Sequence, residues 1–332
     1  MKTVRACTSC GKNARPGATR IIAHNMIAEI NIGIQIGLLL LLGFSAIRLK
    51  VVTSAFPSEL SGFLISFCLP CVIIKALLSE SGSLEMSSFA WSTAVTIIIS
   101  LVGLVLAVVC VRLARIKNDF SKVIIATTMF SNFTFMGYPI IEALYANEGL
   151  LYITLMSILM RFFLYGFAPM IFTVSSERSR ISLVKFFLSP PILAIFVGLA
   201  LALLKVELPA PVNNVIDGLA TVSSTLGMML CGMLVARLDL RTLFKDKNVL
   251  LATAVRVFLM PLISFICLWF LPVPRTLVNT GIIVAALPAG SILSAYAAKG
   301  GVYPEQTSAI ISLSTILSLV TVPLWAWILT LV

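Results

Sequence analysis

The chain has 332 residues, of which 59% are hydrophobic and only 11% are charged, and its formal net charge is +11. Soluble globular domains are about 45–50% apolar and about 25% charged, so this composition excludes an ordinary soluble fold. The mean hydropathy of +1.08 and the recurrence of long apolar runs instead indicate an integral membrane protein.

Ten long apolar runs follow one another along the chain, and none alternates apolar and polar residues as a half-buried strand does. Lipid offers no partner for backbone groups, so a span must be a helix or part of a closed barrel, and unbroken runs favour helices. A helical span needs about 20 apolar residues. The sequence therefore predicts an all-α integral membrane protein with spans near residues 28–48, 57–78, 88–111, 120–145, 150–174, 189–205, 210–236, 248–271, 276–298 and 307–331.

The basic residues gather in alternate loops. Loops that join an odd-numbered span to the next even-numbered span carry 14 basic residues, whereas the opposite loops carry three, Lys75, Lys205 and Arg275. Positive residues stay cytoplasmic, so this asymmetry predicts a multi-pass protein of the cell membrane with both ends of the ten-span unit outside. The positive net charge is then an orientation signal, and we expect no nucleic-acid partner. Lys75 ends the second span and is expected at the surface.

Residues 1–25 do not fit this orientation, because they carry five basic residues and no acidic one, and such a tail resists translocation. Translation from Met26 would remove the conflict and leave 26–332 as one ten-span domain; an Arg-rich targeting segment is the alternative. The tail's C-x-x-C pair, Cys7 and Cys10, offers two of the roughly four ligands that a zinc site needs, so we expect no metal.

The two halves of the chain match in hydropathy at a shift of 155 residues, which places spans one to five (about 28–175) on spans six to ten (about 189–331). Because five is odd, the second repeat must insert upside down, and inverted repeats are typical of secondary transporters. In this register the fourth and ninth spans are both interrupted, by SNFTFMGYP (131–139) and LPAGS (287–291). Paired interruptions point to a binding site at the midplane, whereas a single one is equally well explained as a proline kink.

The interruptions predict two half-helices that begin near Pro139 and Ser291 and approach the midplane from opposite sides, with Gly137 and Gly290 giving backbone freedom beside the breaks. The free N–H groups and positive end of a half-helix bind anions. Polar side chains at the breaks can add neutral hydrogen bonds, and neither break contains an acid that would hold a bare cation. The candidate substrate-binding residues at the breaks are Ser131, Asn132, Thr134, Gly137, Pro139, Pro288, Gly290 and Ser291.

Three charged residues inside the spans are further candidates, because intramembrane charges are costly and usually functional. Arg256 in span eight is a candidate substrate-binding residue and Arg161 in span five a candidate counter-charge. The alternative for each is a structural cation that pairs with backbone carbonyls or reaches an interface. Glu142 is a candidate carrier of a coupling proton, unless it is an ordinary interfacial acid. The chain has no P-loop, G-x-S-x-G or H-E-x-x-H motif, so we expect neither enzymatic activity nor a cofactor.

Several stretches resemble the auxin efflux carrier family. The run SNFTFMGYPIIEALYANEGL (131–150) is similar to its fourth-span motif, and SPPILAIFVGLALAL (189–203), RVFLMP (256–261) and LSTILSLVTVPLW (313–325) are similar to its sixth, eighth and tenth spans. The resemblance covers about 28–331. It implies a ten-span carrier in which the discontinuous helices four and nine cross, and whose substrates are organic anions such as auxin, malonate or malate.

The short loop between spans five and six resembles the bacterial branch of malonate and malate permeases, which would place the chain in an inner membrane. The chain departs from the family pattern at Ser189, where Asn is usual, and at the less polar break Ala289 to Ser291. The family implies alternating access, in which the crossed helices move against the rest, with H⁺ or Na⁺ coupling and a homodimer left open. The alternative function is a membrane sensor or receptor that keeps the fold, although no loop exceeds about 20 residues, which is short for an output domain.

Overall fold

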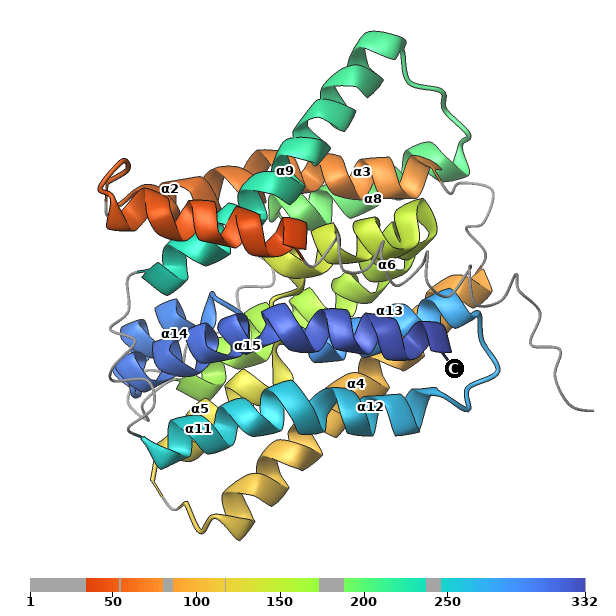
Figure 1. Ribbon diagram of the computed structural model, residues 1–332. Coiled ribbons are helices and arrows are strands. Elements are labelled where there is room, and N and C mark those ends of the chain that lie inside the picture. The colour runs from red at the N-terminus through yellow and green to blue at the C-terminus, as the bar shows by residue number, and fades with distance from the viewer. Residues whose placement is uncertain are drawn as a thin grey trace, which may run out of the picture.

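The computed structural model describes residues 34–53, 55–79, 86–116, 118–172, 188–236 and 246–331. The predictions for the basic tail and its C-x-x-C pair lie outside the described residues. Within these ranges the regular elements are helices and π-helical turns, and one isolated antiparallel bridge joins Ser131 to Ala289 (Figure 1).

The first half of the chain contains a long helix that is interrupted at Ala146, where φ is 49° and ψ is −141°. The Tyr138 hydroxyl donates a hydrogen bond to Ser157 Oγ at 3.1 Å, so the parts before and after Ala146 lie side by side as an antiparallel pair. They correspond to the end of the predicted fourth span and to the predicted fifth span. The elements are helix Ile34–Arg48, α2 (Phe56–Phe63), η1 (Leu64–Cys68), α3 (Leu69–Ser79), α4 (Met86–Leu113), α5 (Phe120–Met129), η3 (Phe133–Gly137) and α6 (Tyr138–Phe172).

In the second half, local sequence sets several helix ends. Pro190 and Pro304 are the first residues of their helices, where a missing N–H costs nothing. Asp246 accepts a hydrogen bond from the Asn248 N–H at 2.8 Å and caps the next helix, and Gly301 ends another with a φ of 64°. The elements are α8 (Pro190–Leu203), α9 (Ala210–Ala236), α11 (Lys247–Ala254), η4 (Val255–Leu259), α12 (Met260–Leu268), α13 (Arg275–Ala286), α14 (Leu293–Gly300) and α15 (Pro304–Leu331).

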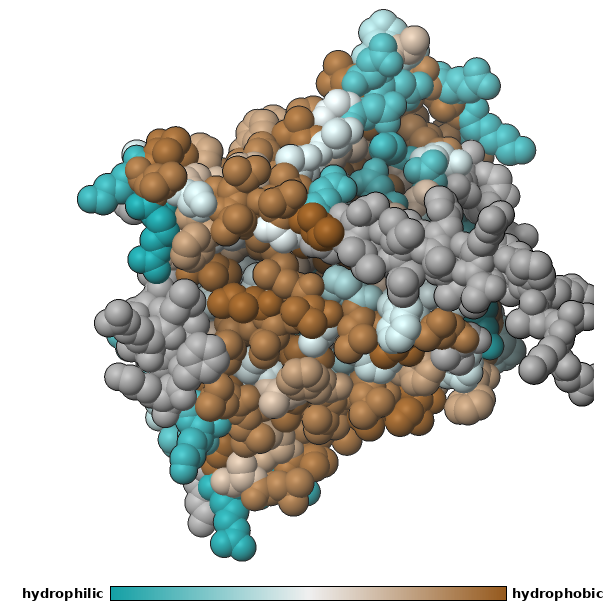
Figure 2. All heavy atoms as spheres, viewed as in Figure 1, coloured by the Kyte–Doolittle hydropathy of each residue, from teal (hydrophilic) through white to brown (hydrophobic). Residues whose placement is uncertain are grey.

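The prediction of an all-α membrane protein is confirmed by the lengths and surfaces of these helices. Side chains such as Leu101, Val105, Phe258 and Ile266 are more than half exposed on α4, η4 and α12, as lipid-facing residues are. Figure 2 shows hydrophobic residues over the middle of the visible face and hydrophilic residues toward its edges. Among the described residues, six helices are long and apolar enough to cross a membrane: Phe56–Ser79, Met86–Leu113, Phe133–Phe172, Ala210–Ala236, Lys247–Leu268 and Pro304–Leu331. Four shorter apolar helices accompany them: Ile34–Arg48, Phe120–Met129, Pro190–Leu203 and Arg275–Ala286.

The helices form two groups, one above the other in the view of Figure 1. The first group contains helix Ile34–Arg48, α2, α3, α8 and α9, and the second contains α4, α5 and α11 to α15. Between them lies α6, which contacts α3 and α9 of the first group and α4 and α13 of the second. Nine of the 12 residues of α13 are buried, which places this interrupted helix at the centre of the second group.

Candidate functional site

The two interrupted spans meet through their backbones. The Asn132 N–H donates to the Pro288 carbonyl at 2.8 Å, and the Gly290 N–H donates to the Phe130 carbonyl at 2.9 Å. These two hydrogen bonds flank the antiparallel bridge between Ser131 and Ala289. Each break thus satisfies backbone groups of the other, which is required because neither has a helical partner and both are buried. We refer to the paired segments 130–132 and 287–291 as the crossing.

The residues that were predicted to bind substrate at the breaks do come together at the crossing, with two corrections. The second half of the fourth span begins at Phe133 and not near Pro139, because residues 133–137 form a π-helical turn in which the Asn132 carbonyl accepts from the Met136 and Gly137 N–H groups, each at 3.2 Å. Only residues 130–132 lie outside helical turns in this span. The wide turn accommodates Pro139, which has no N–H to donate. Thr134 lies inside this turn and is partly exposed.

The second correction concerns the glycines, which serve close packing and not unusual backbone angles. Neither Gly137 nor Gly290 has a positive φ. A Cβ on Gly137 would lie 3.0 Å from methyl groups of Ile153 and Leu287, and one on Gly290 would lie 3.3 Å from the Ser131 carbonyl oxygen. In the ninth span, α14 begins at Leu293, two residues after the expected Ser291.

Arg256 is fully buried and donates its hydrogen bonds to backbone carbonyls at the crossing. Its Nε and Nη2 donate to the Leu287 carbonyl at 3.0 and 2.7 Å, and its Nη1 donates to the Thr128 carbonyl at 2.8 Å. These carbonyls end α13 and α5, where the helix dipole is negative. The geometry therefore favours the structural alternative for Arg256, a cation that neutralises two helix C-termini at the same point.

A polar cavity of about 260 Å³ lies beside the crossing. Pro139 and Glu142 form one wall of it on α6. The facing walls come from helix Ile34–Arg48 and α9, and they include Gln35 and Ser224. Small-molecule sites in proteins are concave, with a few polar groups among apolar ones. The remaining lining residues are Ile36, Leu39, Ala143, Thr221, Thr225 and Met228.

Glu142 is the centre of a charged cluster at this cavity. It accepts a hydrogen bond from Ser224 Oγ at 2.9 Å, and its other oxygen lies 3.5 Å from Lys75 Nζ. Lys75 Nζ also lies 3.7 Å from a carboxylate oxygen of Asp217. Lys75 was expected at the surface; its side chain is 25% exposed and lies between Glu142 of α6 and the more exposed Asp217 of α9. Glu142 lines the cavity, and its side chain is 29% exposed.

Sequence reasoning missed the polar stripe of α9. Thr221, Ser224 and Thr225 recur at helical spacing and line the cavity opposite Glu142. Hydroxyl residues at i, i+3 and i+4 inside a predicted span were a signal for a polar face, but their partner lies 82 residues away in the sequence. Two turns further along α9, Cys231 accepts a weak hydrogen bond from the Asn132 side-chain amide at 3.5 Å.

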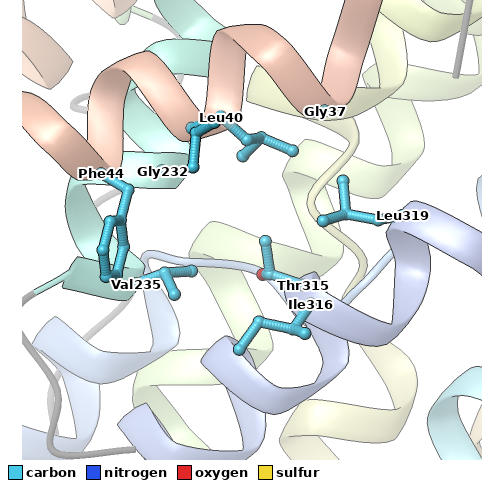
Figure 3. Close-up of a pocket in the computed structure, with 9 residues that line it drawn as sticks. Gly37, Leu40, Phe44, Gly232, Val235, Thr315, Ile316 and Leu319 are labelled. Atoms are coloured by element: carbon cyan, nitrogen blue, oxygen red, sulfur yellow. The ribbon is translucent and has the colours of Figure 1, made fainter. Parts of the chain in front are cut away.

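A second cavity, of about 230 Å³, is almost wholly apolar. Figure 3 shows Leu40 and Phe44 of helix Ile34–Arg48 facing Thr315, Ile316 and Leu319 of α15 across it, with Gly232 and Val235 of α9 at one side. Both cavities use helix Ile34–Arg48 and α9 as walls, and in each the opposite wall is α6 or α15. The packing is thus open along the border of the first group of helices.

Arg161 completes the set of predicted residues. Its side chain is fully buried, and its guanidinium carbon lies 5.1 Å from the centre of the Phe133 ring. Phe133 is the first residue of η3, so Arg161 lies beside the crossing. The structure therefore brings Ser131, Asn132, Pro288, Gly290, Arg256 and Arg161 together at the crossing, with Pro139 and Glu142 at the polar cavity next to it.

Comparisons with known proteins agree with this architecture. The profile of the family described as "Membrane transport protein" matches residues 33–326. Among curated proteins, the "Lysosomal cholesterol signaling protein" of Mus musculus is 25% identical over 217 residues, which cover 59% of this chain but 24% of that protein. The family match spans nearly the whole chain and confirms the resemblance seen in the fourth-span motif. The chain belongs to the membrane transport protein family, the family of the auxin efflux carriers.

Proposed function

We propose that this chain is a ten-span carrier that moves small organic anions across a membrane by alternating access. The observation that carries the proposal is the antiparallel crossing of two interrupted helices at Ser131 and Ala289. Irregular backbone at membrane depth persists where protein buries it or where it lines a cavity. In transporters, paired discontinuous helices form the substrate site near the midplane.

We infer that the ten spans form two inverted five-span repeats. An inverted repeat relates its halves by a two-fold axis in the membrane plane, so equivalent segments must cross antiparallel. The bridge has this sense, and its two hydrogen bonds run in opposite directions between the strands, from Asn132 to Pro288 and from Gly290 to Phe130. The breaks also fall in the register that the 155-residue shift requires, since Ser131 shifts to position 286 and the second break starts at Leu287.

The electrostatics of the crossing favour an anion. Of the four helix ends that meet there, the two C-termini already have a cation, Arg256. The two N-termini, at Phe133 and Leu293, carry a positive partial charge of about half an elementary charge each. At Leu293 the first N–H groups already bond to the carbonyls of Gly290 and Ile292, so free N–H groups are expected at the Phe133 end. Asn132 adds a side-chain amide whose protein partner is only a weak sulfur acceptor. Small carboxylates of the malonate or malate kind suit this site, in line with the short loop after the fifth span.

The two cavities indicate which parts move. Each lies between helix Ile34–Arg48 and α9 on one side and α6 or α15 on the other. Sliding the second group of helices along the first would change the side from which the crossing is reached. Glu142 lies on the moving side and Ser224 on the fixed side of this border. Protonation of Glu142 would release Lys75 for an incoming carboxylate, which makes H⁺ the coupling ion that we favour over Na⁺.

For its location, we propose a multi-pass protein of the cell membrane with both ends of the ten-span unit outside, since the basic loops divide 14 to three. For a bacterial member this is the inner membrane. A second candidate function, a membrane sensor, has support in the name of one relative, a signaling protein. The chain matches 24% of that protein's length, so a shared signalling role needs its own test.

The test is uptake into proteoliposomes of radiolabelled malonate, malate and indole-3-acetate, with pH and sodium gradients varied separately. Asn132→Ala should raise the apparent Kd for the transported anion about tenfold or more, because a hydrogen bond to a charged group contributes about 1.5–3 kcal/mol. Cys231→Ala is the matched control, since it removes the sulfur partner of the amide and keeps the amide itself. Native protein that transports none of these anions, with or without gradients, would contradict the proposed function.

A further inference from the structure

Arg161 differs from the other buried arginine in having no hydrogen-bond partner. Its side chain is 0% exposed, and none of its three guanidinium nitrogens bonds to a protein atom within the described residues. Arg256, equally buried, uses its three nitrogens on two backbone carbonyls. Buried polar groups in native proteins are hydrogen-bonded, and buried charges are paired. The N–H groups of Arg161 are therefore unexplained by the protein alone.

The position of Arg161 follows from the antiparallel packing around Ala146. Tyr138 bonds to Ser157 across the pair, so four or five residues further from the turn Phe133 lies opposite Arg161, as the 5.1 Å contact shows. Arg161 is thus at the depth of the crossing, against the first residue of a helix that runs from Phe133 to Phe172 with one interruption. Two features that favour negative charge, a helix N-terminus and a buried guanidinium, coincide there.

The face of α6 that carries Arg161 is polar and buried along two turns. Thr154, Ser157 and Arg161 lie at i, i+3 and i+7, and all three are 0% exposed. Side chains in helices lean toward the N-terminus, so Arg161 extends toward Ser157 and Thr154. The Thr154 hydroxyl also has no hydrogen-bond partner among the described residues. Other buried hydroxyls in the described part of the chain, such as those of Thr128 and Thr280, also lack a partner, so the unpaired guanidinium is what distinguishes this face. Charged side chains inside a membrane are costly and usually functional.

The contact with the Phe133 ring indicates which kind of ligand Arg161 could bind. A guanidinium over an aromatic ring is stabilised through its flat face, which leaves the N–H groups at its edge for other partners. These N–H groups form a planar fork that matches both oxygens of one carboxylate. Of the ion pairs within the described residues, none involves Arg161, so a carboxylate of the protein does not take this place.

We propose that Arg161 binds a carboxylate group of the carried anion at the crossing, through the edge of its guanidinium. The proposal rests on the proposed function and identifies the residue that selects for a carboxylate. It gives the two buried arginines separate tasks: Arg256 holds the crossing together, and Arg161 holds the ligand.

The experiment measures thermal unfolding of the purified full chain in detergent while malonate, acetate or chloride is titrated at constant ionic strength. Native protein should be stabilised by malonate and acetate at lower concentrations than by chloride. Arg161→Gln should raise the apparent Kd for malonate at least tenfold. Arg161→Lys keeps the charge without the planar fork, so it should bind more weakly than native protein and lose the preference for carboxylate over chloride. Arg275→Gln, an exposed arginine stacked on Trp269, is the matched control and should bind as native protein does.

Several results would overturn the inference. An unchanged Kd in Arg161→Gln would show that the arginine is structural. Equal stabilisation of native protein by chloride and malonate would show that carboxylate geometry is not recognised, and no stabilisation by any anion would mean that water alone occupies the site. If Arg161→Gln does not fold, an Arg161→Lys protein with native carboxylate preference gives the same negative answer. Binding that depends on Arg161 without proteoliposome uptake would defeat the proposed carrier function alone, whereas uptake with native KM in Arg161→Gln would defeat only this inference.

Discussion

The role of Arg256 gives the sharpest prediction from the described geometry. Two helix C-termini, each with a partial charge of about −0.5, end at the carbonyls that Arg256 binds, so their sum of about −1 matches one guanidinium. These carbonyls belong to Thr128 and Leu287, and both residues are 0% exposed. Removing the cation would leave two buried carbonyls without a donor and a net negative charge inside the second group of helices.

The magnitude follows from the hydrogen bonds. In Arg256→Gln the shorter glutamine side chain can donate a hydrogen bond to one of the two carbonyls, so at least one carbonyl stays unpaired. An unpaired buried acceptor costs about 1–3 kcal/mol, and each hydrogen bond from a charged donor contributes about 1.5–3 kcal/mol. Relief from burying a charge offsets part of this loss. We expect a net loss of about 2–4 kcal/mol in the free energy of unfolding, with a larger loss for Arg256→Leu, which serves neither carbonyl.

The assay is unfolding of the purified variants in detergent, paired with substrate binding at a temperature where each is folded. Arg275→Gln serves as control, because Arg275 also donates to a carbonyl, that of Trp269 at 3.1 Å, but is exposed; its loss should cost about 0.5–1 kcal/mol. The folded fraction of Arg256→Gln should bind substrate with nearly native affinity. A variant of native stability that has lost substrate binding would refute this reasoning and return Arg256 to the role of counter-charge.

Three further predictions concern packing, coupling and orientation. Gly232→Ala should abolish accumulation of folded protein, measured by size-exclusion chromatography, because its Cβ would lie 1.9 Å from the Leu40 carbonyl oxygen; Gly37→Ala, with nothing within 4 Å of its Cβ, should be neutral. Glu142→Gln should keep uptake down an anion gradient but abolish its dependence on a pH gradient, and retained dependence would exclude Glu142 as proton carrier. A cysteine at the exposed Leu204, in a cysteine-free background, should react with an impermeant thiol reagent from outside; labelling only from inside would reverse the proposed orientation.

Local sequence was enough to predict most of the helices and both helix breaks. The helix breaks could be predicted because a polar, proline-containing stretch interrupts each of the two apolar runs, at residues 131–139 and 287–291. The long apolar runs set the helices in the same way, since each run alone is long enough to need a membrane. What failed was the start of the half-helix at Phe133, which depends on a contact far along the chain, the hydrogen bond from Asn132 to Pro288.

Two kinds of contact in the site could not be predicted from the sequence: contacts between residues far apart in the chain, and contacts with backbone carbonyls. Lys75 was expected at the surface because it ends the second span; its partners Glu142 and Asp217 lie on two other helices and could not be identified from the sequence. Arg256 could be recognised as an intramembrane charge but not as a structural one, because its acceptors are backbone carbonyls, and any residue has one. A charged residue in a span therefore marks a candidate functional position, and its role follows only from its contacts in the folded structure.

The crossing also explains how the backbone itself can help to hold an anion, in addition to the side chains of Arg161 and Lys75. Each interrupted helix contributes one negative and one positive end to the same place. Because Arg256 cancels the two negative ends through carbonyl contacts, the two positive ends at Phe133 and Leu293 remain uncompensated within the described residues. That residual charge is fixed in the backbone and moves with the second group of helices, so the site stays matched to an anion as access changes sides.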